Sequence, residues 1–181
     1  MDASGIKVAN RGDWIRHKWK VRRGYLKIHI AVDVKRKKIL ALQVTDEKVG
    51  DGRMLQSLVE EASGNTKIAE ALGDGAYDSK RNFHYLAEKG IEPVIRVRRN
   101  SSRKAKGCMA RKRVVVEYLN DPEAWKRKHD YGQRWMAETV FSSYKRVFGE
   151  YVSAKKLENM ARELMIKANL YNAFIELTTN L

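Results

Sequence analysis

The sequence predicts a mixed α/β fold, and two observations support this prediction. Two runs rich in β-branched residues, 25–34 and 39–45, flank a short polar segment, so they predict an antiparallel hairpin. The segments that follow alternate between helix-like and strand-like patterns. Strands that first pair as a hairpin and then alternate with helices indicate a mixed sheet. We expect a single domain over 1–181, because this length suits one hydrophobic core.

The first half of the chain can be assigned element by element. Asp33 ends the first strand and is expected to open the hairpin turn. Residues 52–62 then predict an amphipathic helix, because their apolar residues recur at i, i+1, i+4 and i+5. A short strand-like run over 68–73 leads directly into Asp74, and 93–97 is a further short strand. The hairpin is therefore followed by helix and strand twice.

Capping residues indicate where the helices begin. Asp78 or Ser79 can cap the helix that lies between the last two strands. Asp121 and Pro122 form an N-cap and first-turn pair for a later helix. Ser153 is expected to cap the C-terminal helix, which runs over about 153–177. One face of that helix is apolar and carries Leu157, Met160, Leu164, Ala168 and Tyr171.

The charge of the chain indicates a polyanionic partner. The net charge is +15, and the binding of nucleic acid rewards such an excess because each neutralised phosphate releases counterions. We expect a basic loop over about 98–120, followed within this range by an edge strand at 113–119. Over 96–113 the chain carries nine cations and no acidic residue: Arg96, Arg98, Arg99, Arg103, Lys104, Lys106, Arg111, Lys112 and Arg113. A solvated basic surface is the alternative, but DNA contact accounts better for so many uncompensated charges.

Composition also excludes several classes of protein. No apolar run has the roughly 18 residues that span a bilayer, and we see no signal peptide. Cys108 is the single cysteine, so it forms neither an internal disulfide nor a metal-binding cysteine pair. There is no glycine-rich phosphate loop, and no small-molecule cofactor is expected. We therefore expect a cytoplasmic, nucleoid-associated protein.

The most informative segment is the helix expected around residues 131–145. At about 100° per residue, Tyr131, Arg134, Glu138 and Lys145 fall within roughly 60° of one another. The opposite side is expected to face the core and carries Met136, Val140, Tyr144 and Val147. Helix geometry alone leaves open a solvated face with an Arg134–Glu138 ion pair. It equally allows a carboxylate site flanked by cations.

Three motifs resemble those of a known enzyme family. The spacing Tyr-x2-Arg-x3-Glu-x6-Lys, with Glu138 at its centre, is similar to the C-terminal signature of the IS4/IS5-type DDE transposases. The Asp-Ala-Ser-Gly sequence that begins at Asp2 resembles the context of that family's first aspartate. The Gly-Asp-Gly-Ala-Tyr-Asp-Ser sequence around Asp74 resembles the context of the second. The resemblance covers nearly the whole chain.

This resemblance implies a fold and a chemistry. It implies a ribonuclease H-like fold, which is a mixed five-stranded sheet flanked by helices, with a helical C-terminal part. Asp2, Asp74 and Glu138 would be the catalytic carboxylates and would bind two Mg²⁺ or Mn²⁺ ions. The implied reaction is cleavage and transfer of DNA strands at the ends of an insertion sequence. The implied partner is DNA, both as the transposon end and as the target. The resemblance also implies that the chain forms a homodimer.

The resemblance and the charge together assign DNA contacts to several cations. The resemblance implies that Tyr131, Arg134 and Lys145 hold phosphates of the transposon end, and their shared face suits that role. From the basic segment we add Arg98, Arg99, Arg103 and Lys104. Trp14, Trp19, Trp125 and Trp135 could stack on bases or anchor the core. None of the four histidines has the spacing of a metal ligand, so a structural role is expected for each.

The chain differs from the family at its start. Family members have a long region before the first aspartate, whereas here that residue is Asp2. We therefore expect a chain truncated at its N-terminus, without the separate DNA-binding domain. This allows an alternative function, an inactive remnant that only binds nucleic acid through its basic surface. An unrelated basic RNA-binding protein of the ribosome would explain the charge but leaves the helix motif as a coincidence.

Overall fold

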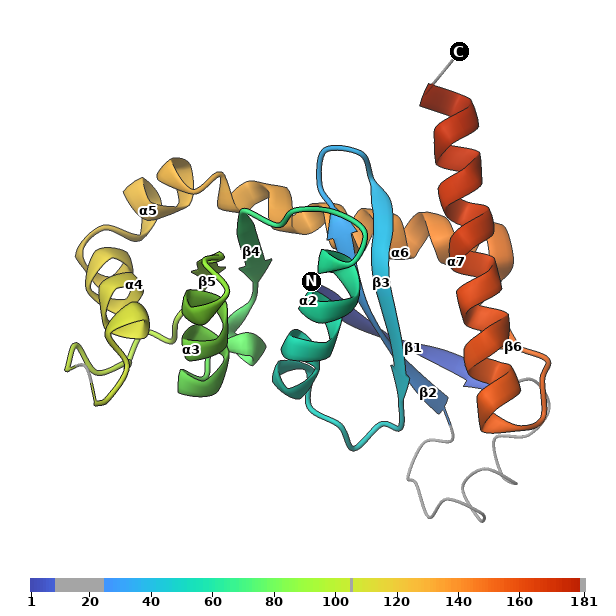
Figure 1. The fold of residues 1–181 in the computed structure, drawn as a ribbon, viewed down its shortest axis with the longest axis horizontal. Coiled ribbons are helices and arrows are strands. Elements are labelled where there is room, and N and C mark those ends of the chain that lie inside the picture. The colour runs from blue at the N-terminus through green and yellow to red at the C-terminus, as the bar shows by residue number, and fades with distance from the viewer. Residues whose placement is uncertain (9–24, 105, 180–181) are drawn as a thin grey trace.

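The computed structural model describes residues 1–8, 25–104 and 106–179, and Figure 1 shows their arrangement. The strands are β1 (Asp2–Val8), β2 (Tyr25–Asp33), β3 (Lys38–Thr45), β4 (Glu70–Gly73), β5 (Glu92–Ile95) and β6 (Tyr151–Val152). The α-helices are α2 (Leu55–Ser63), α3 (Lys80–Glu88), α4 (Met109–Asn120), α5 (Pro122–Lys128), α6 (Trp135–Phe148) and α7 (Leu157–Thr179). Short 3-10 helices are η1 (Asp51–Met54), η2 (Gly75–Tyr77) and η3 (Tyr131–Arg134). The predicted mixed α/β class is confirmed.

The strands form two sheets instead of the single five-stranded sheet that the resemblance implied. The first has four strands in the order β3-β2-β1-β6, with β1 antiparallel to β2 and parallel to β6. The second has two parallel strands, β4 and β5. The main-chain nitrogen of Met1 donates a hydrogen bond of 2.9 Å to the carbonyl of Leu72, but no ladder between β1 and β4 extends this contact in the described residues. Residue patterns identify strands but not the neighbours with which they pair, so this part of the expectation was wrong.

The four-stranded sheet is covered by helices on both faces. On one face, residues of α6 and α7 such as Val140 pack against Ile6, Leu26, Ile28 and Ile30. On the other face, small residues of β2 and β3 pack against Leu58 and Ala62 of α2. In Figure 1, α2 lies in front of this sheet, with α6 behind it and α7 beside β3. The hairpin prediction is confirmed, and the Asp33 carboxylate accepts hydrogen bonds from the turn nitrogens of Lys35 and Arg36.

The β4–β5 pair has a core of its own. It packs against α3 and α4, with the side chains of Trp125 and Tyr131 completing the cluster.

The segment 113–119 lies in α4 and is helical, so the predicted edge strand was wrong. Ala110, Val114, Val115 and Tyr118 are buried at a helical spacing. This tertiary packing overrides the strand preference of three consecutive valines. The basic loop expected over about 98–120 accordingly ends where α4 begins, at Met109.

The capping predictions had mixed outcomes. The Ser79 hydroxyl caps α3 by accepting from the Asn82 nitrogen, and Asp121 caps α5 with Pro122 in its first turn. The C-terminal helix begins at Leu157, so Ser153 does not cap it. The main-chain nitrogen of Ser153 instead donates to the Glu163 carboxylate. The predicted core face of this helix is confirmed except at Leu157, which is exposed.

The remaining predictions concern membrane crossing, the tryptophans and the histidines. None of the helices in the described ranges combines the length and apolar character that a bilayer crossing requires. Trp14, Trp19 and His17 lie outside the described residues. His29 is fully buried and bonded to Thr45, which agrees with a structural role. Trp125 is a core residue, whereas Trp135 is 55% exposed.

Candidate active site

Asp2 is directed toward α6 by the pairing of β1 with β2. It lies opposite Ile30, and residues directly opposite in an antiparallel pair project from the same face of the sheet. Ile30 belongs to the core beneath α6 and α7, so the Asp2 carboxylate lies on the α6 side. Burial raises the pKa of Asp2. The nearby Glu138 carboxylate adds to this rise, whereas the Arg134 guanidinium opposes it.

Asp74 lies in the turn that follows β4. Its carboxylate accepts a hydrogen bond of 2.8 Å from the Ala76 nitrogen and thereby caps η2. The buried Asn82 side chain holds this turn against η1, because it donates to the carbonyls of Gly52 and Tyr77 at 2.9 and 3.0 Å. A Cβ atom on Gly52 would lie 2.4 Å from the carbonyl oxygen of Ala76. The close approach of η1 to the Asp74 turn therefore requires glycine at position 52.

Glu138 lies in the first turn of α6. Its carboxylate accepts a hydrogen bond of 2.7 Å from the Arg134 guanidinium, one helical turn earlier, and the Glu138 side chain is 55% exposed. The ion pair that helix geometry predicted is therefore present. Because Arg134 also affects the pKa of Asp2, this guanidinium lies near both carboxylates.

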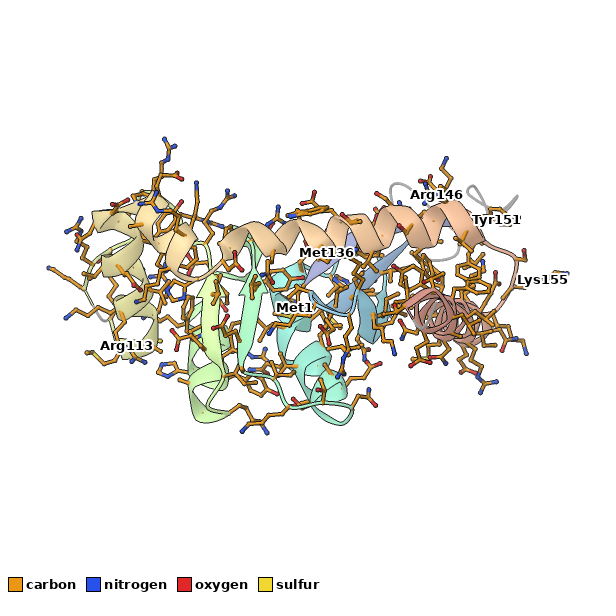
Figure 2. All side chains as sticks on the ribbon, turned by 90° about the horizontal axis from the view of Figure 1, so that it is seen from above. Met1, Arg113, Met136, Arg146, Tyr151 and Lys155 are labelled. Carbon is orange, nitrogen blue, oxygen red and sulfur yellow. The ribbon has the colours of Figure 1, made fainter. Side chains whose placement is uncertain are left out.

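A cavity of about 500 Å³ joins the start of β1 to one face of α6. Its charged and hydroxyl-bearing lining consists of Asp2, Ser4, Glu138, Ser142, Lys145, Arg146 and Glu150. Figure 2 shows α6 running lengthwise along one side of the molecule, from Met136 toward Arg146 near the end that carries α7. Two of the predicted carboxylates and the predicted Lys145 thus share one cavity, and two cations on α6 face its acidic groups.

Tyr131 connects the start of this helical region to the Asp74 turn. Its side chain is buried, and its hydroxyl donates a hydrogen bond of 3.1 Å to the carbonyl of Gly73. Burial raises the pKa of Tyr131, and Asp74 is close enough to add to the rise. Tyr131 therefore anchors η3 beside Asp74. Its predicted contact with DNA is not tested by this geometry.

Asp74 lies beside the cavity but is not part of its lining. Burial raises the pKa of Tyr131 and of Tyr77; the charge of Asp74 adds to both shifts, and that of Asp2 adds to the shift of Tyr77. The four-stranded side brings together Asp2, Arg134, Glu138 and Lys145. Asp74 approaches them from the end of β4. The candidate site is therefore the junction between the two sheets.

The predicted core side of α6 is confirmed in part: Val140 and Tyr144 are buried, whereas Met136 is only half-buried. The core side of α6 consists of Ala137, Val140, Phe141 and Tyr144. Val147, which we expected on that side, is 53% exposed because it lies at the last turn, beyond the edge of the core. Arg146 lines the cavity but was not among the predicted site residues. The spacing from Glu138 to Ser142 and Arg146 is i, i+4 and i+8, so helical geometry could have identified both residues.

The predicted basic residues lie on the β4–β5 side. They precede α4 and are exposed: Arg98, Arg99, Arg103 and Lys104.

Asp78 does not cap α3. Its carboxylate forms a two-pronged ion pair with Arg111 of α4, with distances of 2.6 and 2.9 Å. This pair accounts for Asp78 without a metal and ties the Asp74 turn to α4.

The donor atoms suit a hard divalent cation, although the arrangement is open. Carboxylate oxygens are the ligands that Mg²⁺ prefers, and Mg²⁺ retains several waters instead of requiring a complete protein cage. Within the described ranges, no three His, Cys, Asp or Glu side chains are gathered as a group that could hold a metal ion. The raised pKa of Asp2 is that of a half-buried carboxylate, which a cation would stabilise.

Comparison with known proteins gives two findings. A family model described as transposase DDE domain matches residues 1–173. No solved structure matches the chain.

Proposed function

Because this chain belongs to the transposase DDE domain family, we propose that it cuts and joins DNA at the ends of a mobile element. We further propose that it is of the IS4/IS5 type, on the strength of the Tyr-x2-Arg-x3-Glu-x6-Lys spacing. The observation that carries the proposal is the shared cavity. Asp2 and Glu138 line it together with Lys145 and Arg146. Acidic ligands for cations and basic groups for phosphates are thus presented side by side.

The proposed catalytic groups are Asp2, Asp74 and Glu138. Two Mg²⁺ or Mn²⁺ ions held by these carboxylates would activate the attacking oxygen and stabilise the leaving one. In the first reaction a water oxygen bonds to phosphorus and the bond to the 3′ oxygen breaks. The products are a 3′-hydroxyl and a 5′-phosphate. In the second, that hydroxyl bonds to a target phosphorus and a target 3′ oxygen leaves.

Residues of α6 and η3 would position the DNA backbone. Lys145 and Arg146 present cations to the cavity that contains the carboxylates, and each can bind a phosphate oxygen. Arg134 is held by Glu138 in the free protein. A DNA phosphate would compete for its guanidinium and thereby free the Glu138 carboxylate for a cation. The exposed Arg98, Arg99, Arg103 and Lys104 would extend this contact along the DNA on the β4–β5 side.

The experiment is nicking of supercoiled plasmid by the purified chain in Mn²⁺. Glu138→Gln keeps the size of the side chain but removes its charge, so nicking should fall on the order of 10²–10³-fold or more. Glu150→Gln is the matched control, because Glu150 lines the same cavity and is exposed. Retained nicking by Glu138→Gln, or equal loss in both variants, would contradict the assignment.

One observation favours a second function. No group of three metal-binding side chains is gathered within the described ranges, and Glu138 is already paired with Arg134. This arrangement suits a protein that binds nucleic acid through its basic surface without cutting it. The same assay distinguishes the two functions when DNA binding is measured alongside. Salt-sensitive binding without nicking in Mn²⁺ or Mg²⁺ would support the second function.

A further inference from the structure

One arginine joins the basic segment of the chain to the Asp74 turn. The Arg111 guanidinium of α4 donates to both oxygens of the Asp78 carboxylate, at 2.6 and 2.9 Å. Its Nη2 atom also donates to the Ser101 hydroxyl, at 3.1 Å. Arg111 is therefore in direct contact with two segments. One follows Asp74 in the chain, and the other carries the exposed cations that precede α4.

On the side of the turn, this contact reaches Asp74 through the main chain. The nitrogen of Tyr77 donates to the carbonyl of Asp74 at 3.1 Å. The nitrogen of Asp78 donates to the carbonyl of Gly75 at 3.4 Å. The Asp78 side chain is 2% exposed, so its carboxylate stays where its partner Arg111 holds it. A displacement of the Arg111 guanidinium should therefore also displace the turn that carries Asp74.

On the other side, the contact lies in a turn that is surrounded by cations. The main-chain nitrogen of Ser101 donates to the carbonyl of Arg98 at 3.0 Å. Arg98, Arg99 and Arg103 are exposed, and no acidic residue occurs over 96–104. Uncompensated cations of this density attract the phosphates of a nucleic acid. A phosphate drawn to this turn would arrive beside Ser101.

Ser101 and Arg111 retain hydrogen-bond donors for such a phosphate. A guanidinium carries more N–H groups than the three contacts of Arg111 use. Within the described ranges no group pairs with its Nη1 atom, and the Arg111 side chain is 20% exposed. The Ser101 hydroxyl accepts from Arg111, so its own proton can be donated. Arginine and serine are both common donors to DNA phosphates.

We propose that Ser101 and Arg111 bind one phosphate of DNA and that Arg111, through Asp78, thereby positions Asp74. The phosphate would accept from Nη1 and from the Ser101 hydroxyl while Arg111 keeps both bonds to Asp78. The guanidinium would then be fixed on two sides, and the turn after β4 would be held in one position. DNA bound on the β4–β5 side would thus order a carboxylate of the candidate site. The proposal rests on the proposed function for its ligand, but not on cleavage.

The test is hydrogen exchange over 73–79, measured by mass spectrometry on the whole chain with and without a saturating short DNA duplex. In the parent, the duplex should slow exchange in this segment about tenfold or more. Ser101→Ala should lose most of this protection and bind the duplex about threefold or more weakly, because one phosphate donor is gone. Ser101→Thr keeps the hydroxyl and should restore both properties.

Ser102→Ala is the matched control. Ser102 is also half-buried, but its hydroxyl accepts from the Lys104 nitrogen and does not contact Arg111. This variant should bind the duplex and be protected like the parent. Circular dichroism establishes that all the variants are folded.

Three outcomes overturn the proposal. They are a parent whose exchange over 73–79 is unchanged by the duplex, equal losses in Ser101→Ala and Ser102→Ala, and a Ser101→Ala variant with parent-like protection at saturating duplex. In the last case, Ser101 would contact DNA at most and would not position Asp74. A parent that is protected by the duplex but does not nick plasmid would support this proposal while contradicting the proposed function, so the two failures are distinguishable.

Discussion

Asp2 forms the terminal pair of a ladder of main-chain hydrogen bonds, whereas Asp74 lies just past the end of one. Asp2 is paired with Ile30 at the end of the β1–β2 ladder, so the main chain itself determines its direction. Asp74 follows the last paired residue of β4, and side chains distant in sequence determine the shape of its turn. Asn82 holds that turn to η1, the Asp78–Arg111 pair holds it to α4, and Tyr131 holds it to η3.

This difference suggests that the two halves of the site respond differently to mutation. A ladder distributes its stability over many similar hydrogen bonds, so the loss of one side chain near Asp2 should have a limited effect. The Asp74 turn depends on a few buried polar contacts, and an unsatisfied buried group costs more than an average hydrogen bond contributes. Single substitutions around Asp74 should therefore reduce both stability and activity.

The largest effect on stability is expected from Arg111→Met. The Asp78 side chain is 2% exposed, so removal of its partner leaves an uncompensated buried carboxylate. Breaking such a pair costs about 3–5 kcal/mol, and urea unfolding should show a loss of this size. Arg113→Met is the control, because Arg113 is an exposed cation of the same helix. Equal small losses in both variants would show that the Asp78 pair does not hold the turn.

A pH-dependent effect is expected on the four-stranded side. Burial lowers the pKa of His29 to about 4, with Asp51 opposing and Lys27 assisting this shift. The unfolded chain, in which the pKa is near 6.5, binds the proton first as the pH falls. The free energy of unfolding should therefore be highest above about pH 6.5 and decrease toward pH 4, by about 3 kcal/mol in total.

His29→Gln tests this origin of the pH dependence. The variant cannot gain the proton, so the decrease between pH 6.5 and 4 should become much smaller. His84→Gln is the matched control, since His84 is exposed, and it should retain the parent's slope. An unchanged slope in His29→Gln would assign the pH dependence to other groups.

The smallest effect on stability is expected from Tyr131→Phe. This change removes the hydroxyl that donates to the Gly73 carbonyl and should cost about 1 kcal/mol. Because Gly73 immediately precedes Asp74, nicking should decrease more than the small loss of stability explains. Tyr151→Phe changes a 51% exposed residue and should leave both properties unchanged. Parent-like nicking by Tyr131→Phe would mean that this anchor does not position Asp74.

Features that depend on neighbouring residues could be predicted from the sequence, whereas features that depend on long-range contacts could not. The β2–β3 hairpin, the Asp33 turn and the Asp121 cap depend on neighbouring residues, and each was predicted correctly. For the cap of α3 the sequence left two candidates, Asp78 and Ser79, of which Ser79 is the cap. The Arg134–Glu138 pair follows from helix geometry. In contrast, α4 is helical because Val114 and Val115 pack on a distant core, and no local pattern reports that contact. The division into two sheets and the Asp78–Arg111 pair are likewise long-range features.

We propose that Asp2 from one sheet and Asp74 from the other bind cations at one site. Mn²⁺ binding, followed by electron paramagnetic resonance, tests it directly with the parent, Asp2→Asn and Asp74→Asn. We predict that the parent binds Mn²⁺ and that each variant binds at least about tenfold more weakly. An Asp74→Asn variant that binds Mn²⁺ as tightly as the parent would contradict the claim, because Asp74 would then lie outside the site.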